Sequence, residues 1–142
     1  MFNSPPASSQ VAASVAVLAE IRFDEKGLVP AIAQDAVTHE ILMVAWMDRA
    51  AFERTIATGR ACYYSRSRKS QWMKGESSGH LQILREVLSD CDGDVVLLKV
   101  EQLGGIACHT GRRNCFFRKL ESGAWVTQFE PLKSETEMYG ER

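Results

Sequence analysis

The sequence lacks an excess of charge of either sign, and it lacks any apolar run long enough to cross a bilayer. Its 142 residues carry a formal net charge of −1, so no overall field attracts the protein to nucleic acid or to a membrane surface. The longest apolar run, from Val11 to Ala19, is shorter than the roughly 20 residues of a transmembrane helix. No Lys or Arg precedes that run, which argues against a secretory signal peptide. We therefore predict a cytoplasmic protein with neither a nucleic-acid nor a membrane partner.

Closely spaced cysteine pairs are also absent. The chain has four cysteines and no CxxC motif, which excludes the usual pattern of a structural zinc ribbon. Cytosolic thiols stay reduced, so these cysteines are expected to be metal ligands, catalysts or core residues rather than disulfide partners. Cys62 lies in a predicted strand, and we assign it to the core.

No internal repeat and no linker divides the chain, and 142 residues suit a single domain. We predict a flexible N-terminal extension over residues 1–19, partly helical where the apolar run lies. The main domain is expected over residues 20–131, and residues 132–142 are expected to form a flexible, charged tail.

The main domain is predicted to be α+β, with a mostly antiparallel sheet and one or two helices. A helix is expected between Asp48, which can cap its start, and Gly59, which can end it. Residues 81–90 fit either a strand or a helix on periodicity alone. Strands are expected over residues 28–36 and 40–47, joined by a turn near residues 37–39, and over residues 61–65, 71–74 and 94–102. A hairpin is expected over residues 115–120 and 124–129.

The stretch "SDCDGDVV" crowds Asp90, Asp92 and Asp94 around one thiol and one glycine. If this stretch runs extended, the three carboxylates share one side and Cys91 faces the other. Converging carboxylates repel one another unless a cation lies among them, and their hard oxygens suit Mg²⁺ or Ca²⁺. The stretch lacks the closing glutamate of an EF-hand. A turn with solvated aspartates remains the alternative.

Three thiols, Cys91, Cys108 and Cys115, lie far apart in the sequence, and His109 follows Cys108 directly. Three thiolates without a close fourth protein ligand fit an open zinc site better than a closed one. His109 is then the candidate base for water activated at that site. Each residue alone is more simply a core thiol or a loop histidine, but the four together favour the metal site. Since Cys91 faces away from the carboxylates, it reaches the other two thiols only through a kinked strand or from a second chain.

The stretch "SRSRKSQWMKG" is basic and contains an aromatic residue. Arg66 and Arg68 can bind phosphate through paired hydrogen bonds, Lys74 adds a point charge, and Trp72 can stack on a flat ring. A solvated basic loop is the alternative. Beside two metal sites, however, these residues predict a phosphorylated, ring-bearing substrate.

Three segments, "YYSRSRKSQWMKGESSGH", "SDCDGDVVLLKVEQ" and "ACHTGRRNCFF", stand in an order and at separations that resemble the phosphoribosyl-AMP cyclohydrolase family. The resemblance covers roughly residues 22–131. It implies a metal-dependent hydrolase that opens the adenine ring of phosphoribosyl-AMP between N1 and C6, in histidine biosynthesis.

The resemblance also implies cofactors and a partner. It places Zn²⁺ on Cys91, Cys108 and Cys115, with Cys91 donated by the other subunit of an intertwined homodimer, and Mg²⁺ on the three aspartates. The residues and the resemblance together give one mechanistic hypothesis, in which water deprotonated with the help of His109 attacks C6 while the basic loop and Mg²⁺ hold the two phosphates. The N-terminal extension and Cys62 are not part of the family's motifs.

Two other functions remain open at this point. A zinc-dependent nucleotide deaminase would use the same metal, but the sequence lacks the HxE…PCxxC arrangement of such enzymes. A non-enzymatic binding module stabilised by zinc would unfold when the metal is chelated, whereas an open catalytic site would only lose activity.

Overall fold

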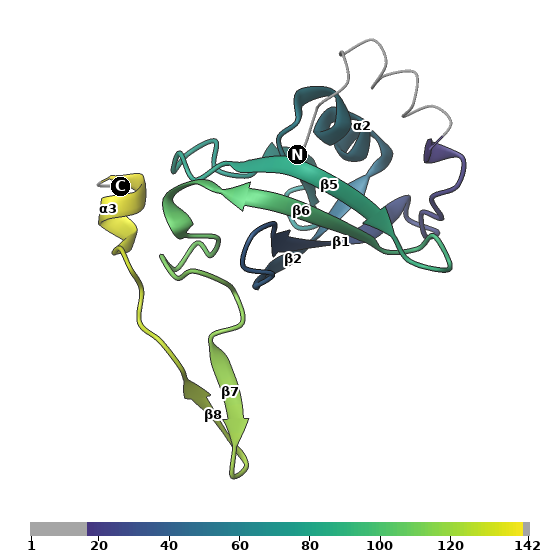
Figure 1. Ribbon diagram of the computed structural model, residues 1–142. Helices are drawn as coiled ribbons and strands as arrows, with labels where there is room; N and C mark the ends of the chain where they lie inside the picture. The colour runs from purple at the N-terminus through teal and green to yellow at the C-terminus, as the bar shows by residue number, and fades with distance from the viewer. Residues whose placement is uncertain (1–16, 141–142) are drawn as a thin grey trace.

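The computed structural model describes residues 17–140, and its body is a six-stranded sheet (Figure 1). The order across the sheet is β4-β3-β2-β1-β6-β5. Its strands are β1 (Leu28–Asp35), β2 (Ile41–Asp48), β3 (Cys62–Ser65), β4 (Ser70–Met73), β5 (Gln82–Ser89) and β6 (Val96–Gln102).

All neighbouring strands in this sheet run antiparallel except β1 and β6, which pair in parallel. The β1–β2 hairpin forms where the sequence predicted it. Its turn is held by the Asp35 carboxylate, which accepts hydrogen bonds from the backbone N–H groups of Val37 at 2.9 Å and Thr38 at 2.8 Å. The side chain thus satisfies two donors that the turn leaves without a backbone partner.

Helix α2 (Arg49–Thr58) has the ends that the sequence predicted. The Asp48 carboxylate accepts from the N–H of Ala51 at 2.8 Å, and Gly59 ends the helix with a φ of 71°. Phe52, which is fully buried, faces the sheet and belongs to the main core. The hydroxyl of Thr55 accepts from the N–H of Cys62 at 2.9 Å, so the helix is also tied to the start of β3. Cys62 is buried, as predicted.

The ambiguous segment over residues 81–90 is a strand. It pairs along β6 from Gln82 opposite Gln102 to Ser89 opposite Val96. The periodicity of this segment fits both a strand and a helix. It forms a strand because β6 offers backbone hydrogen-bond partners along its length.

Strands β7 (Arg118–Glu121) and β8 (Ala124–Thr127) form a separate two-stranded hairpin that projects from the body (Figure 1). All eight residues are exposed, including Leu120 and Trp125. Strand β7 begins at Arg118 and not at Cys115, where the sequence predicted its start. The N–H of Cys115 donates to the carbonyl of Leu42 at 2.8 Å instead of joining the hairpin.

The C-terminal residues contain helix α3 (Glu135–Tyr139), which begins with a capping box between Ser134 and Glu137 and buries Met138. The predicted domain boundaries, including the flexible tail from residue 132, stay predictions. The helix predicted in the N-terminal extension falls largely on residues 1–16, outside the described part of the chain.

The fold class is confirmed as α+β, with a mixed but mostly antiparallel sheet and helices α2 and α3. The intertwined homodimer stays a prediction. Among the described residues, no helix combines the length and the apolar character needed to cross a membrane.

Candidate active site

Two adjoining cavities lie where the β3–β4 hairpin meets the loop that follows β6. The first cavity, of about 310 Å³, is lined by residues that include Lys74, Glu76, Ser77 and Cys115. The second, more open cavity, of about 960 Å³, is lined by residues that include Trp46, Tyr64, Arg66 and Ser67. Both cavities share three lining residues: Arg68, Trp72 and His109. The structure therefore gathers His109, Trp72 and the basic residues of the predicted site around one concave surface.

The loop over residues 103–117, called here the cysteine loop, brings Cys108 and Cys115 together. The N–H of Cys108 donates to the carbonyl of Arg112 at 3.1 Å, and the N–H of Gly111 donates back to the carbonyl of Cys108 at 3.0 Å. This tight turn places His109 between the two cavities. Gly111 has a φ of 87°, and a Cβ at this position would lie 1.9 Å from the carbonyl oxygen of Lys133, so the turn requires glycine.

The surroundings of Cys108 favour the thiolate form of its side chain. A hydrogen bond with the Cys115 thiol lowers the pKa of Cys108 to about 5 against the opposing effect of burial, and it raises the pKa of Cys115. The hydroxyl of Thr110 also donates to the Cys108 sulfur at 3.1 Å. Because zinc binds thiolates rather than thiols, the chemistry of this pair fits a soft divalent metal.

Lys74 lies beside the two thiols rather than at the rim of the cavity. Its ammonium group donates to the carbonyl oxygen of Ala107 and lies 5.8 Å from the centroid of the Trp72 ring. Burial lowers the pKa of Lys74, while Cys115 and Cys108 oppose that effect. Lys74 was predicted to bind substrate. Its positive charge lies where it also favours the thiolate forms of Cys108 and Cys115.

The arginines of the β3–β4 turn are differently placed. The guanidinium carbon of Arg66 lies 4.7 Å from the centroid of the Trp46 ring, and Arg68 lines both cavities. Neither forms an ion pair with a carboxylate of residues 17–140. Cations that face a cavity without a carboxylate partner favour an anionic ligand.

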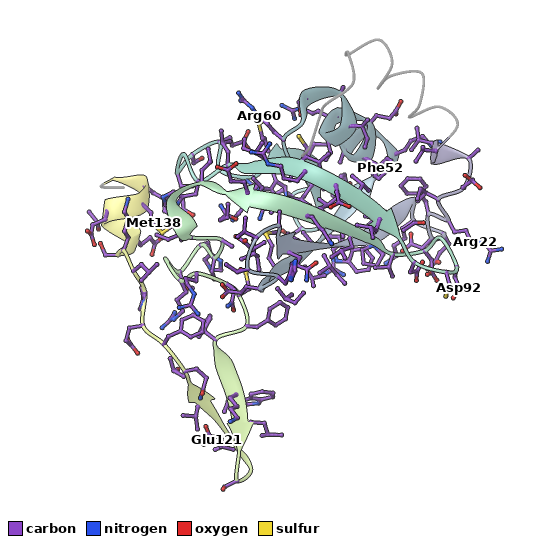
Figure 2. All side chains as sticks on the ribbon, viewed as in Figure 1. Arg22, Phe52, Arg60, Asp92, Glu121 and Met138 are labelled. Atoms are coloured by element: carbon purple, nitrogen blue, oxygen red, sulfur yellow. The ribbon has the colours of Figure 1, made fainter. Side chains whose placement is uncertain are left out.

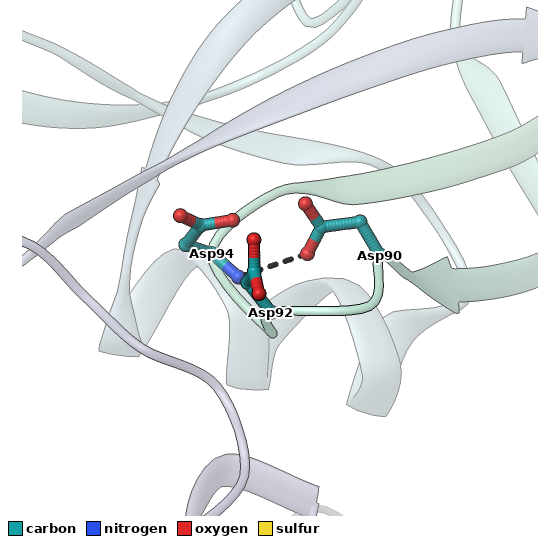
Figure 3. Close-up of side chains that lie close together, drawn as sticks. All are labelled: Asp90, Asp92 and Asp94. Atoms are coloured by element: carbon teal, nitrogen blue, oxygen red, sulfur yellow. Dashed lines mark hydrogen bonds between the residues drawn. The ribbon is translucent and has the colours of Figure 1, made fainter.

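The three aspartates lie in the turn between β5 and β6, called here the aspartate turn (Figure 3). The expectation that this stretch runs extended is wrong: Gly93 has a φ of 72°, and the Asp90 carboxylate accepts from the N–H of Asp94 at 3.0 Å. The carboxylates converge nonetheless, because one ligand oxygen from each of Asp90, Asp92 and Asp94 lies within 4.8 Å of the others.

The carboxylates of the aspartate turn affect one another's protonation. A hydrogen bond with Asp90 and the charges of Asp90 and Asp92 raise the pKa of Asp94. Slight desolvation pushes the pKa of Asp90 upwards, but hydrogen bonds from Asp94, Val95 and Gly93 outweigh it, so that this pKa is lowered. Three hard oxygen ligands at this spacing fit a cation such as Mg²⁺.

Cys91 is exposed and belongs to the aspartate turn, whereas the cysteine loop follows the other end of β6. Figure 2 shows Asp92, of the aspartate turn, and Met138, which packs against Gly111, at opposite ends of the sheet. At about 3.3 Å per residue, the 7 residues of β6 separate the two loops by about 23 Å. Within the described residues, Cys91 therefore does not join Cys108 and Cys115, and a kinked strand does not bridge the gap.

Sequence reasoning missed several residues at this site. Glu76 and Ser77 line the first cavity, and their position in the turn between Gly75 and Gly79, directly after Lys74, was the available signal. His80 is buried, and its Nδ1 atom has no hydrogen-bond partner in the described structure. Its ring packs so closely on Gly104 that a Cβ there would lie 2.3 Å from the His80 Cδ2 atom. No sequence pattern indicated this contact.

Comparison with known proteins gives a consistent result. The model of the family described as Phosphoribosyl-AMP cyclohydrolase matches residues 43–117. A Phosphoribosyl-AMP cyclohydrolase from Neisseria gonorrhoeae (strain NCCP11945) is 58% identical over 124 residues, covering 87% of this chain and 95% of the relative. Relatives of the same name from Bordetella petrii and Chromobacterium violaceum are 59% and 54% identical, covering 86% and 89% of this chain and 94% and 96% of the relatives.

Proposed function

Because this chain belongs to the phosphoribosyl-AMP cyclohydrolase family, we propose that it hydrolyses the C6–N1 bond of the adenine ring of phosphoribosyl-AMP, a step of histidine biosynthesis. The observation that carries this proposal is the position of His109. It lines both cavities together with Trp72 and Arg68, and it follows directly after one of two paired thiols. Such a site offers a base, an aromatic platform and cations to one phosphorylated ring.

Zinc is proposed to bind Cys108, Cys115 and Cys91 of the partner subunit. The low pKa of Cys108 and the exposed position of Cys91 support this ligand set. When bound, the metal would supply a Lewis acid that makes a water molecule more acidic.

His109 is proposed to accept the proton of the attacking water. The oxygen of this water forms a bond to C6, which then becomes the carbon of a carboxamide. The C6–N1 bond breaks, its electron pair returns to N1, and N1 takes up the proton that His109 releases. Trp72 would hold the ring by stacking, since it lies at the junction of the two cavities.

Magnesium is proposed to bind Asp90, Asp92 and Asp94. Because Cys91 lies in the same turn as these aspartates, a partner subunit that supplies Cys91 to the thiol pair also brings three carboxylates to the cavities. A magnesium ion held there would neutralise the carboxylates and offer coordination positions to a substrate phosphate. The aspartate turn of the same chain is too far away to do this.

A homodimer is proposed, and the open face of the sheet supports it. Ile32 is opposite Val44 on β2 and Leu97 on β6, and Leu97 is opposite Leu88 on β5. Residues directly opposite one another point to the same face, so these four apolar side chains form a row across four strands, called here the apolar row. Val44 and Leu88 are 49% and 40% exposed. An apolar row of this kind is typical of a surface that a partner covers.

The decisive experiment is an assay of purified, zinc-loaded protein on phosphoribosyl-AMP. We expect ring-opened product without release of ammonia, and we expect Cys108→Ala to abolish it. Chelation of zinc should remove activity while circular dichroism still reports a folded chain. Ammonia release would indicate a deaminase, and unfolding on chelation together with no turnover would indicate a binding module.

A further inference from the structure

We propose that the two cavities bind the two phosphoribosyl arms of the substrate separately, with the N1-linked arm in the first cavity and the N9-linked arm in the second. This inference rests on the proposed function and assigns a role to each half of the site. The substrate carries one phosphoribosyl group on N1 of the six-membered ring and one on N9 of the five-membered ring. A site for such a molecule needs a place for the ring and two places for the arms.

The shared residues define the place for the ring. Trp72 and His109 line both cavities, so a purine stacked on Trp72 would have one arm on each side of this junction. Arg68 also lines both cavities and can bind the ring or either arm.

The position of Cys115 decides the orientation. It lines the first cavity and is absent from the lining of the second. C6 must lie near the thiol pair to be attacked there, and N1 is bonded directly to C6. The ribose on N1 therefore starts within the first cavity. N9 lies on the far side of the purine, so its arm extends into the second cavity.

The second cavity suits a phosphate. Arg66 lines it, the Arg66 guanidinium is held over the Trp46 ring, and no carboxylate of residues 17–140 pairs with it. The hydroxyl groups of Ser65 and Ser67, which also line this cavity, lie 3.3 Å from each other. A guanidinium beside hydroxyl donors matches the oxygen atoms of a phosphate monoester.

The first cavity suits a ribose. Glu76 and Ser77 line it, and a carboxylate accepts hydrogen bonds from ribose hydroxyls in nucleotide sites. The loop that carries them is closed by a hydrogen bond from the N–H of Gly79 to the carbonyl of Gly75 at 2.7 Å. A Cβ on Gly75 would lie 2.4 Å from the backbone of His80, so the backbone approaches closely there. The acidic and hydroxyl groups are thus held in a fixed place.

Two matched variants and one probe test the assignment. AMP carries the ring and the N9-linked arm only, so its competitive inhibition constant reports the second cavity. We expect Arg66→Gln to raise that constant about tenfold, the loss expected for one charge-assisted hydrogen bond, and Glu76→Gln to leave it within about twofold of wild type. Both variants should raise the KM for phosphoribosyl-AMP.

Control variants separate these effects from a general loss of charge. Lys119→Gln removes a cation from the exposed β7–β8 hairpin, and Glu53→Gln removes a carboxylate from the exposed face of α2; neither residue lines either of the two cavities. Both should leave the AMP inhibition constant and the KM unchanged. Weaker AMP binding in Glu76→Gln, or no change in Arg66→Gln, would overturn the assignment even in an active enzyme. Absence of turnover by the wild-type protein would instead overturn the proposed function.

Discussion

At the scale of single residues, His109 is exposed and lines both cavities, and it lies next in sequence to a buried thiol. Its backbone belongs to the turn that positions Cys108, but its side chain is not one of the proposed zinc ligands. Catalysis and metal binding can therefore be separated at this position.

We expect His109→Ala to lower kcat by about 10²–10⁴-fold, the usual contribution of a general acid or base, while zinc content stays near that of wild type. Steady-state kinetics combined with metal analysis on the same preparation would measure both. Parallel losses of zinc and activity would instead make His109 a structural residue.

A second residue-scale prediction concerns the Asp35 carboxylate, which holds the β1–β2 turn. Burial pushes its pKa upwards, but hydrogen bonds from Thr38 and Val37 outweigh burial, and the pKa lies below the ordinary value of 3.8. A carboxyl group with a lowered pKa in the folded state stabilises the fold above its unfolded pKa, and this contribution is lost as pH falls through the folded value.

Asp35→Ala should accordingly lower the free energy of unfolding at pH 7 by about 1 kcal/mol. The difference from wild type should shrink as the pH drops below about 4. Urea unfolding at pH 7, 5 and 3 would measure it, with Glu53→Gln as a control on an exposed helix face. A difference that is constant across this range would contradict the role assigned to the ionised carboxylate.

At the scale of elements, the cysteine loop depends on the C-terminal segment. The N–H of Leu132 donates to the carbonyl of Gly111 at 2.8 Å, and the Met138 sulfur would lie 3.3 Å from a Cβ on Gly111. Helix α3 thus packs over the turn that joins the two thiols, and its displacement should disturb the proposed zinc site.

Gly111→Ala tests this connection. The new Cβ would meet the Lys133 carbonyl at 1.9 Å, so we expect loss of zinc affinity as well as stability. Gly123→Ala is the matched control, because Gly123 also has a positive φ, 80°, but a Cβ there meets nothing within 4 Å. Both substitutions carry a backbone cost of about 1–2 kcal/mol, and only Gly111→Ala should lower zinc affinity. Equal zinc affinity in the two variants would refute the coupling.

At the scale of the whole molecule, the proposed zinc site is incomplete in one chain. Mixed dimers of Cys91→Ser and Cys108→Ser chains would contain one site that has lost both thiols and one that has lost neither. Each variant alone should be inactive. Co-refolding equal amounts should restore about a quarter of wild-type activity if subunits pair at random in a two-fold symmetric dimer. If the mixture stays inactive, the sharing of zinc between subunits is refuted.

The apolar row offers an independent test of the dimer. Val44→Glu would place a charge at the β2 end of the row. We expect light scattering to show a monomer and kinetics to show loss of activity, because a single chain lacks the partner's Cys91. Val37→Glu introduces the same charge in the β1–β2 turn, where Val37 is 87% exposed, and it should stay dimeric. A dimeric and fully active Val44→Glu protein would exclude this face as the interface.

The sequence by itself determined the features that depend on near neighbours. Asp48 and Gly59 predicted the ends of α2, the turn at residues 37–39 predicted the β1–β2 hairpin, and the three motifs identified the family. Helix caps and turns are satisfied within a few residues, so their signals are local.

Only the tertiary structure decided which distant residues meet. The pairing of Cys108 with Cys115, the separation of Cys91 from both, and the parallel contact of β1 with β6 depend on packing between segments far apart in the chain. The β5 segment became a strand because β6 offered backbone partners, which its own periodicity could not reveal. The aspartate stretch forms the turn between β5 and β6 rather than an extended run, as its Asp and Gly residues favour, and it took the paired strands to fix where the three carboxylates converge. The two-part cavity likewise exists only because the β3–β4 hairpin and the cysteine loop fold against each other.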